Sequence, residues 1–202
     1  MGSLDNFNSV LLIAIHPSQK NRHVSQDDDD TAKPYMLSAY MGVAERTDAD
    51  VLTDFSDNYD VDTDGKTILS HISTALGNSF AHNFFINNYG KANFCVRPGK
   101  ALAIGGHQTG KHSHSPYVDW GFLTRASLND LRIEILPMAL YNYYKHSSGS
   151  IWYGMTTQRH RYDGHQKMLD DIQADLPAKY RDILMYCRYK LASPSVASDG
   201  PV

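Results

Sequence analysis

Cysteine is scarce in this chain of 202 residues, which has only Cys95 and Cys187 and no CxxC spacing. Both lie in apolar stretches, which favours buried, reduced thiols over a disulfide or a thiolate metal site. Long apolar runs are also missing, since none approaches the ~18 residues typical of a membrane span. No basic segment precedes the first apolar run, so no signal peptide is expected. We therefore expect a cytoplasmic protein that makes no contact with a membrane.

Positive charge is sparse in the first part of the chain. The formal net charge is -3, and Asp dominates residues 27 to 64, whereas Lys and Arg gather in the last quarter. Binding to a polyanion, if it occurs, is expected in that quarter. The length and the hydrophobic content of 42% suffice for one core. We predict a single domain over residues 1–191, a disordered Ser/Pro/Gly-rich tail over 192–202, and a monomer.

Apolar segments in the first part predict strands alternating with helices. The run "SVLLIAI", residues 9–15, is typical of a strand buried on both faces. Pro34 opens a predicted helix, and a short strand is expected over residues 51–55. The helix would present one apolar face made of Tyr35, Leu37, Met41 and Ala44. This order predicts an α/β fold with a three-layer, Rossmann-like parallel sheet flanked by helices.

The later part of the chain continues the alternation. Residues 66–89 have helical spacing of apolar residues, and Gly90 is a natural helix end. "ANFCVRPG", residues 92–99, contains a short strand, and "SLNDLRIEILPMALYNYYK", residues 127–145, predicts a helix that Pro137 bends or ends. "SGSIWYGMTT" is a further strand candidate. The segment 164–191 predicts one or two amphipathic helices broken at Pro177.

Four polar residues attract attention as candidates for chemistry. Ser18 and Asn21 follow the first strand, where α/β folds place their active sites, although such loop residues most often make only turn hydrogen bonds. Glu134 lies in an apolar segment, where a carboxylate is costly unless paired, and nearby Arg132 offers an ordinary surface pairing. Tyr153 closes the later strand candidate and, taken alone, is an ordinary core tyrosine.

A histidine group gives an alternative. His107, His112 and His114 in "GGHQTGKHSHS" have a spacing similar to the first metal motif of a cupin. The flanking residues are Gly and Ser rather than strand formers, and the Glu usual in that motif is absent. A metal-dependent cupin-like or hydrolytic enzyme therefore stays open as a rival interpretation.

Taken in order, these pieces resemble a cyclodipeptide synthase, and more closely the fungal group that makes arginine-containing cyclodipeptides. The resemblance rests on Ser18 and Asn21 after the first strand, on "ERTDADVLTD", on "IEILPMAL" with Glu134, and on "SGSIWYG" with Tyr153. Departures are His16 in place of a family Gly, and Asp130 in place of a Tyr. The resemblance implies a fold like the catalytic domain of class I aminoacyl-tRNA synthetases, with no cofactor and no metal.

The resemblance also implies a reaction. Two aminoacyl-tRNAs would act as activated esters: Ser18 would become aminoacylated, Asn21 would fix the loop, Glu134 would hold the substrate ammonium, and Tyr153 would hydrogen bond the reacting groups. The resemblance to the arginine-using group implies that one substrate is arginyl-tRNA, and paired carboxylates would suit its guanidinium. The substrate-binding candidates are His16, Asp54, Asp57 and Asp130.

Docking of tRNA needs cations, and the resemblance does not place them. We expect phosphate contacts from Arg159, Arg161 and Lys167, although a cationic helix face is more often simply solvated. A non-catalytic tRNA-binding module is the second rival interpretation. The sequence does not identify the second amino acid.

Overall fold

The structure, a computed structural model, describes residues 22–27, 29–106, 117–146, 158–173 and 176–192, without side chains for 158–162. Its strands are β1 (His23–Ser25), β2 (Thr31–Ala32), β3 (Val51–Val61), β4 (Thr67–Ser73), β5 (Phe94–Val96) and β6 (Ile133–His146). Its helices are α1 (Met36–Arg46), α2 (Phe80–Asn83), α3 (Pro98–Ala103), α4 (Val118–Leu128), α6 (Gln158–Gln173), the 3₁₀ turn η1 (Ala178–Tyr180) and α7 (Arg181–Leu191). None of these helices combines the length and the apolar character needed to cross a bilayer.

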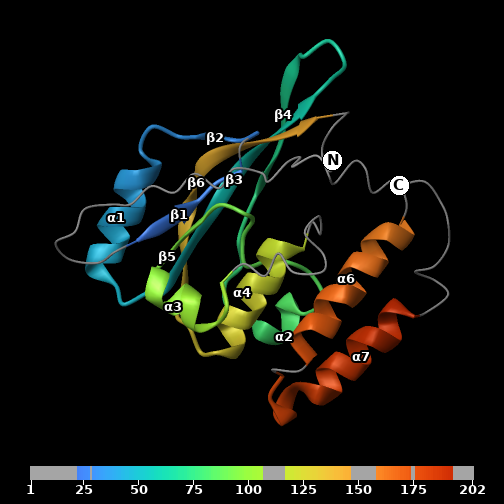
Figure 1. Cartoon of the computed structure of the whole chain (residues 1–202). Coiled ribbons are helices and arrows are strands. Elements are labelled where there is room, and N and C mark those ends of the chain that lie inside the picture. The colour runs from blue at the N-terminus through green and yellow to red at the C-terminus, as the bar shows by residue number, and fades with distance from the viewer. Residues whose placement is uncertain (1–21, 28, 107–116, 147–157, 174–175, 193–202) are drawn as a thin grey trace, which may run out of the picture.

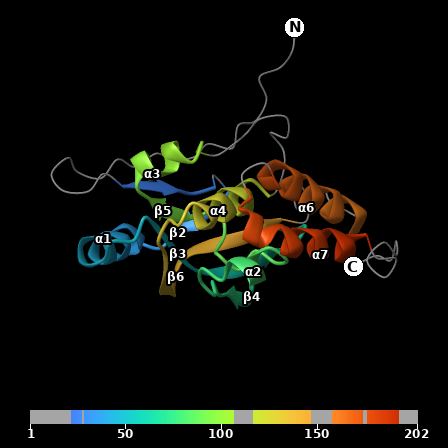
Figure 2. The ribbon, with the colours of Figure 1, turned by 90° about the horizontal axis from the view of Figure 1, so that it is seen from below.

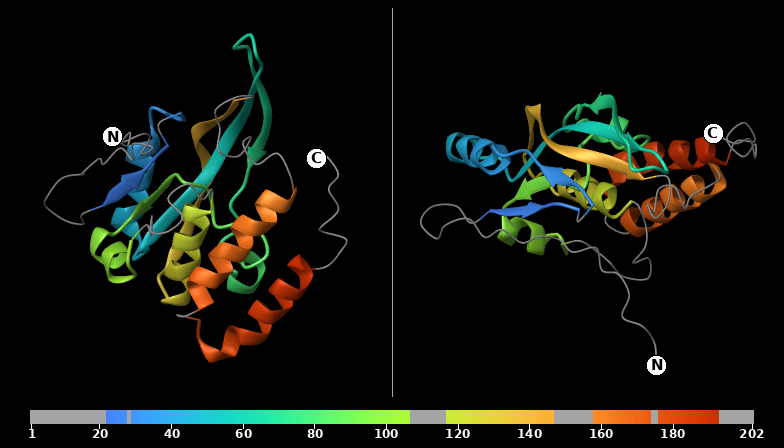
Figure 3. Two further views of the ribbon diagram at one scale, coloured as in Figure 1. Left: turned by 45° about the vertical axis from the view of Figure 1, so that its right-hand side comes forward. Right: turned by 90° about the horizontal axis from the view of Figure 1, so that it is seen from above.

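The described strands form one mixed sheet. Its order is β1-β5-β3-β6-β2. β4 also pairs with β3, along residues 56–61, whereas β5 pairs with residues 51–52. β3 and β6, the two long strands, run parallel, whereas β1·β5, β2·β6, β3·β4 and β3·β5 are antiparallel. The α/β class is therefore confirmed, but a parallel sheet is the wrong description of the described strands. Figure 1 shows the sheet curling, with the β3–β4 hairpin projecting beyond the helices, and the left view of Figure 3 shows the same hairpin.

Helices cover both faces of the sheet. Successive side chains of a strand point to opposite faces, and Val51 and Leu52 accordingly belong to two separate apolar clusters. Leu52 packs with Met36, Tyr40 and Ala44 of α1. Val51 belongs to the larger cluster, to which α2, α4, α6 and α7 contribute. Figures 1 and 2 show α1 at one end of the sheet and α6 and α7 side by side at the other.

The segment around Glu134 is a strand, not the predicted helix. β6 contains Tyr141, Tyr143 and Tyr144, residues that suit a pleated surface. A proline cannot donate to a ladder, and β6 accommodates Pro137 at an irregularity. The register with β3 moves from Asp54↔Leu136 to Phe55↔Ala139, so Pro137 falls outside that ladder. This irregularity interrupts the two-residue alternation expected of a strand, so the apolar residues of β6 have a spacing that resembles that of a helix.

The predicted helix over residues 66–89 is also wrong. The segment forms β4 and the short α2. The turn between β3 and β4 has local polar support: Asp62 Oδ1 accepts hydrogen bonds from the backbone N–H of Asp64 at 3.0 Å and of Lys66 at 2.8 Å. Gly65 takes a φ of 78° there, a value that glycine adopts without strain. Part of the Asp-rich stretch therefore builds a turn.

Other expectations are confirmed. A helix follows Pro34, but the predicted buried face is wrong except for Ala44: the buried residues are Met36, Tyr40 and Ala44, and Tyr35 is exposed. A short strand occupies residues 94–96, and two helices flank Pro177. Both cysteines are buried free thiols. The helix α4 was not predicted from the sequence.

Candidate functional site

A cavity of about 260 Å³ opens between β3, the end of β4 and the segment that follows α2. Within the described part of the chain, its walls hold one cationic side chain, Lys91, and one carboxyl group, Asp54. The remaining lining residues are small or uncharged: Ser56, Ser73, Thr74, Ala75, Asn87, Asn88 and Gly90. A concave site with a few convergent polar groups is the usual form of a small-molecule site.

The local sequence explains why Lys91 reaches this cavity. Tyr89 is fully buried, which fixes the chain just before it. Gly90 has a φ of 145°, and a Cβ there would lie 2.9 Å from Thr53 Cβ. Only glycine allows so close an approach of this backbone to β3. The next residue, Lys91, is thereby placed over the middle of the sheet.

Lys91 makes two polar contacts with neighbouring strands. Its Nζ donates a hydrogen bond to Asn58 Oδ1 and lies 3.8 Å from the centroid of the Tyr143 ring. Burial lowers the pKa of Lys91 to about 8, and the positive charge of Lys145 adds to that effect. The ammonium therefore stays mostly protonated at pH 7.

Asp54 is a buried carboxyl in β3, with 4% of its surface exposed. Burial raises the pKa of Asp54 well above its usual range, while the Tyr40 hydroxyl and the Leu140 backbone act in the opposite direction. Neither carboxylate oxygen has a hydrogen bond of good geometry within the described residues. The neutral acid is therefore the favoured form of Asp54 near pH 7.

Asp119 lies in the first turn of α4, beside the cavity wall. Asn87 Nδ2 donates a hydrogen bond to Asp119 Oδ2 at 3.4 Å. Burial raises the pKa of Asp119 to about 7, even though the backbone amide of Trp120 and the charge of Lys91 lower it. A carboxyl group that titrates near neutral pH is suited to accept a proton in a reaction.

The packing of α4 fixes Asp119. Trp120 Nε1 donates to Asn83 O at 2.7 Å, and the Trp120 ring lies 4.4 Å from the His165 ring of α6, centroid to centroid. His165 Nε2 in turn lies 2.9 Å from Phe84 O, so it donates to that carbonyl. These contacts join α2, α4 and α6 around the start of α4.

A cluster of acidic residues precedes β2, and its charges act on Asp119 and Lys91. Carboxylate oxygens of Asp27, Asp29 and Asp30 lie within 4.8 Å of one another. Such oxygens are ligands that Mg²⁺ and Ca²⁺ prefer, so these residues could hold a divalent cation. Asp30 is buried, its Oδ1 accepts the Tyr144 N–H at 3.1 Å, and burial raises the pKa of Asp30 to about 7.

Replacement of Asp30 by Asn is expected to stabilise the protein at pH 8. The raised pKa means that folding favours the neutral carboxyl, so the stability contributed by protonation is complete below pH ~4 and is lost as the pH rises through about 7. Asn keeps an acceptor for the Tyr144 N–H and carries no charge. Urea unfolding should show a gain of roughly 2 kcal/mol at pH 8 and none at pH 4. An equal gain at both pH values would contradict this origin.

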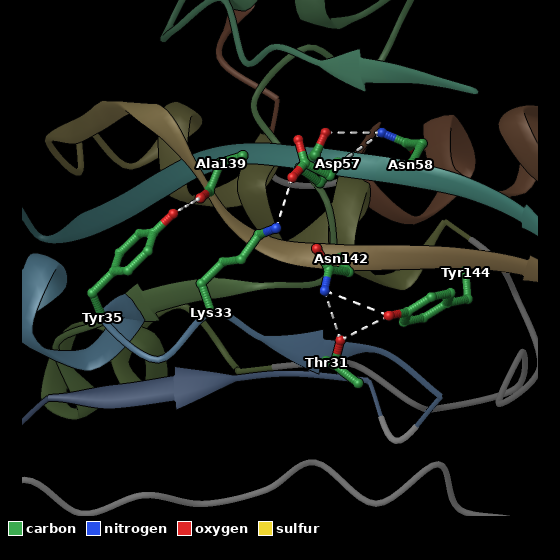
Figure 4. A network of polar contacts seen from close by, with 9 residues as sticks. Thr31, Lys33, Tyr35, Asp57, Asn58, Ala139, Asn142 and Tyr144 are labelled. Atoms are coloured by element: carbon green, nitrogen blue, oxygen red, sulfur yellow. Dashed lines mark hydrogen bonds and ion pairs between the residues drawn. The ribbon is translucent and has the colours of Figure 1, made fainter. Parts of the chain in front are cut away.

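A polar network links β2, β3 and β6 near these residues (Figure 4). Lys33 Nζ binds Asp57 Oδ2 at 2.7 Å. Thr31 Oγ1 lies 3.2 Å from Tyr144 Oη and accepts from Asn142 Nδ2 at 3.0 Å. Asp57, a predicted substrate ligand, therefore already has a cationic partner in its own chain.

The structure separates the other described candidates from the cavity walls. Glu134 lies on β6 and forms an ion pair with Arg132, whose side chain is mostly exposed. Asp130 is an exposed turn residue with a φ of 55°, between α4 and β6. Lys167 is exposed on α6. Among the predicted substrate-binding and catalytic residues that the structure describes, Asp54 alone lines the cavity.

Several predicted residues lie outside the part of the chain that the structure describes. Arg159 and Arg161 belong to α6 by backbone, without described side chains. The others are His16, Ser18, Asn21, Tyr153, His107, His112 and His114.

Sequence reasoning missed Lys91, Asn87, Asp119 and Asp30. The wrong helix over residues 66–89 concealed Asn87 and placed Lys91 in a connector. Asp119 had a usable signal, because it is a lone carboxylate between Val118 and Trp120 at the start of an apolar helix. Asp30 was interpreted as part of a solvated acidic run, yet 8% of its surface is exposed.

Comparison with known proteins gives a likeness of fold. No family model and no curated protein match the chain. Solved structures do match, among them the crystal structure of Staphylococcus aureus TarS, residues 1–349, in complex with UDP-GlcNAc. The TM-score is 0.51 at 16% identity, over 77% of this chain and 44% of that one. The chain thus spans less than half of the TarS structure. At this identity the fold alone is shared.

Proposed function

We propose that this chain transfers a glycosyl group from a nucleoside diphosphate sugar to an acceptor hydroxyl. The observation that carries the proposal is the position of Asp119, which accepts a hydrogen bond from Asn87 in the wall of the cavity that contains Lys91. Burial also raises the pKa of Asp119 to about 7. In the reaction, the acceptor oxygen bonds to the anomeric carbon, and the bond from that carbon to the diphosphate breaks with its electron pair. The acceptor proton passes to Asp119, the general base.

The arrangement of charges supports this chemistry. The reaction needs a base on the acceptor side and positive charge where the diphosphate leaves. Asp119 and Lys91 supply one group of each kind, and they interact electrostatically. The amide of Asn87 joins the two parts, since Asn87 lines the cavity and donates to Asp119.

The likeness of fold adds support from outside the chain. TarS is a glycosyltransferase, and its matching structure contains a nucleotide sugar. One fold can host many activities, so this likeness counts as analogy. The likeness of fold makes nucleoside diphosphate sugars the first donors to test.

The test is release of nucleoside diphosphate from UDP-, GDP- and dTDP-sugars, with Mg²⁺ or Mn²⁺ and a panel of hydroxyl acceptors. Chromatography would follow both the free diphosphate and the glycosylated acceptor. Turnover that is present in the wild type and lost in Asp119→Asn supports the proposal. Failure of the wild type to bind or turn over any of these donors would overturn it.

The cyclodipeptide synthase hypothesis stays a second candidate, favoured by the order of its four sequence motifs. Ser18, Asn21 and Tyr153 lie outside the described residues. The hypothesis includes a Rossmann-like sheet of the class I aminoacyl-tRNA synthetase type and arginyl-tRNA as one substrate. Mass spectrometry of expressing cells, with Ser18→Ala as control, would detect an arginine-containing diketopiperazine.

Replacement of Glu134 by Gln separates the two candidates. The Arg132–Glu134 ion pair is partly exposed, so its loss is expected to change stability by less than about 1 kcal/mol. Glycosyl transfer should then continue at the wild-type rate, because Glu134 does not line the cavity. A cyclodipeptide synthase would instead lose product formation. Parallel assays of both products on one preparation give the answer.

A further inference from the structure

We propose that Lys91 is the residue that binds the diphosphate of the donor, and that the cavity around it is an anion site. This inference rests on the proposed function, because it assigns one part of that donor to one described side chain. It adds a binding residue and a ligand chemistry to the site.

The first argument is that the described lining of the cavity holds a cation and no carboxyl group that favours its ionised form. Among the lining residues that the structure describes, Lys91 is the one cation and Asp54 is the one carboxyl. Asp54 is buried without a well-placed hydrogen bond among the described residues, so its neutral form is favoured. The lining itself therefore contributes a positive charge, and Asp119 and Asp30, which lie outside the lining, help to keep Lys91 in its charged form.

The second argument concerns hydrogen bonds. A lysine ammonium has three N–H donors. Asn58 Oδ1 accepts one, and the face of the Tyr143 ring attracts the ammonium. Among the described residues these contacts leave a donor available for a ligand in the cavity. The hydroxyls of Ser73 and Thr74, also on the wall, can add donors to phosphate oxygens.

The third argument is that the site is rigid. Asn58 is fully buried, and its Nδ2 donates to Ser56 O at 3.0 Å and to Ser73 Oγ at 3.0 Å. Asn58 therefore presents its oxygen toward Lys91. Gly90, pressed against Thr53, fixes the backbone of Lys91. A preorganised cation binds an anion without a large cost of ordering.

Cavity size limits what the described walls enclose. Pockets for drug-sized ligands measure roughly 300–1,000 Å³, whereas this cavity measures about 260 Å³. It has room for a diphosphate but not for a whole nucleotide sugar. We therefore place the phosphates at Lys91 and the remainder of the donor outside this cavity.

The test compares ligands with and without phosphates. Calorimetry would measure UDP, GDP and ADP against uridine, guanosine and adenosine, on the wild type and on Lys91→Gln. Loss of the charged hydrogen bond is expected to weaken the bound diphosphate by about 10- to 100-fold. Affinity for the matching nucleoside should stay unchanged, and Lys91→Arg should restore most of the diphosphate affinity.

Two controls make the outcome decisive. Lys66→Gln removes the same charge at the exposed hairpin turn and should leave all affinities unchanged. Thermal unfolding checks that Lys91→Gln is folded, and Lys91→Met serves if it is not. If the wild type transfers sugar while Lys91→Gln binds the diphosphate as tightly, the inference fails and the proposed function stands. If the wild type binds no nucleoside diphosphate, both fail.

Discussion

Replacement of Asp119 by Asn is expected to lower kcat for glycosyl transfer by about 100- to 10,000-fold, the usual contribution of a general base. Asn has nearly the same shape and can still accept the Asn87 hydrogen bond, but it cannot take a proton. The wild-type rate should rise with pH through about 7, as Asp119 loses its proton, and fall above about 8, as Lys91 loses its charge. The remaining activity of the variant should show no such rise. Initial rates between pH 5.5 and 9 measure both effects.

A matched control comes from another helix. Asp182 occupies the first turn of α7, as Asp119 does in α4, but it is exposed. Asp182→Asn alters the charge at a helix N-terminus and should leave the rate and its pH dependence unchanged. If the Asp119→Asn variant keeps the wild-type pH profile, Asp119 is not the base.

The same variant should be more stable than the wild type at pH 8. Burial raises the pKa of Asp119, so charging this carboxyl opposes folding, and the stability due to protonation is lost as the pH rises from ~4 through about 7. Loss of a favourable helix N-terminal charge offsets part of the gain. A variant that is less active but more stable is typical of the loss of a functional carboxylate, because groups kept for activity often lower the stability of the folded protein.

The sequence predicted those parts of the fold where local chemistry and tertiary structure agree. The helix after Pro34 and the helices around Pro177 have proline signals and apolar spacing that point to the same answer. The buried, free state of Cys95 followed from its apolar neighbours. In these segments the local sequence pattern is enough to predict the helix, and no contact with a distant part of the chain has to be known.

The sequence failed where a long-range contact decides the structure. β6 has apolar residues at helical intervals because the register jump near Pro137 interrupts its alternation, and only β3 reveals that jump. The exposed side chains of Ile68, Leu69 and Ile72 gave β4 no two-residue pattern. The site depends on the same partners, because Lys91 meets Asn58 and Tyr143 across two strands. The spacing of residues along the chain does not predict those contacts.

Positioning of Asp119 depends on close packing between α4 and α6, which a pair of glycines can test. Replacement of Gly164 by Ala should destabilise the protein, because a Cβ there would lie 2.1 Å from Tyr117 Cε2. The Tyr117 ring must move, and overpacking of this kind costs about 1–3 kcal/mol or more. Tyr117 immediately precedes α4, so its displacement should also shift Asp119 and slow transfer. Calorimetry should show a melting temperature lower by roughly 3 to 10 °C.

Gly121→Ala is the matched control on the facing helix. A Cβ at Gly121 would meet Met168 Cγ at 3.6 Å, which is ordinary van der Waals contact. Ala is the better helix former by about 1 kcal/mol, so this variant should melt slightly higher and keep full activity. The two variants make the same chemical change at one interface, and the structure predicts opposite signs. If both variants changed the melting temperature and the activity equally, Tyr117 would not lie against Gly164. The packing of α4 on α6 would then not explain the position of Asp119.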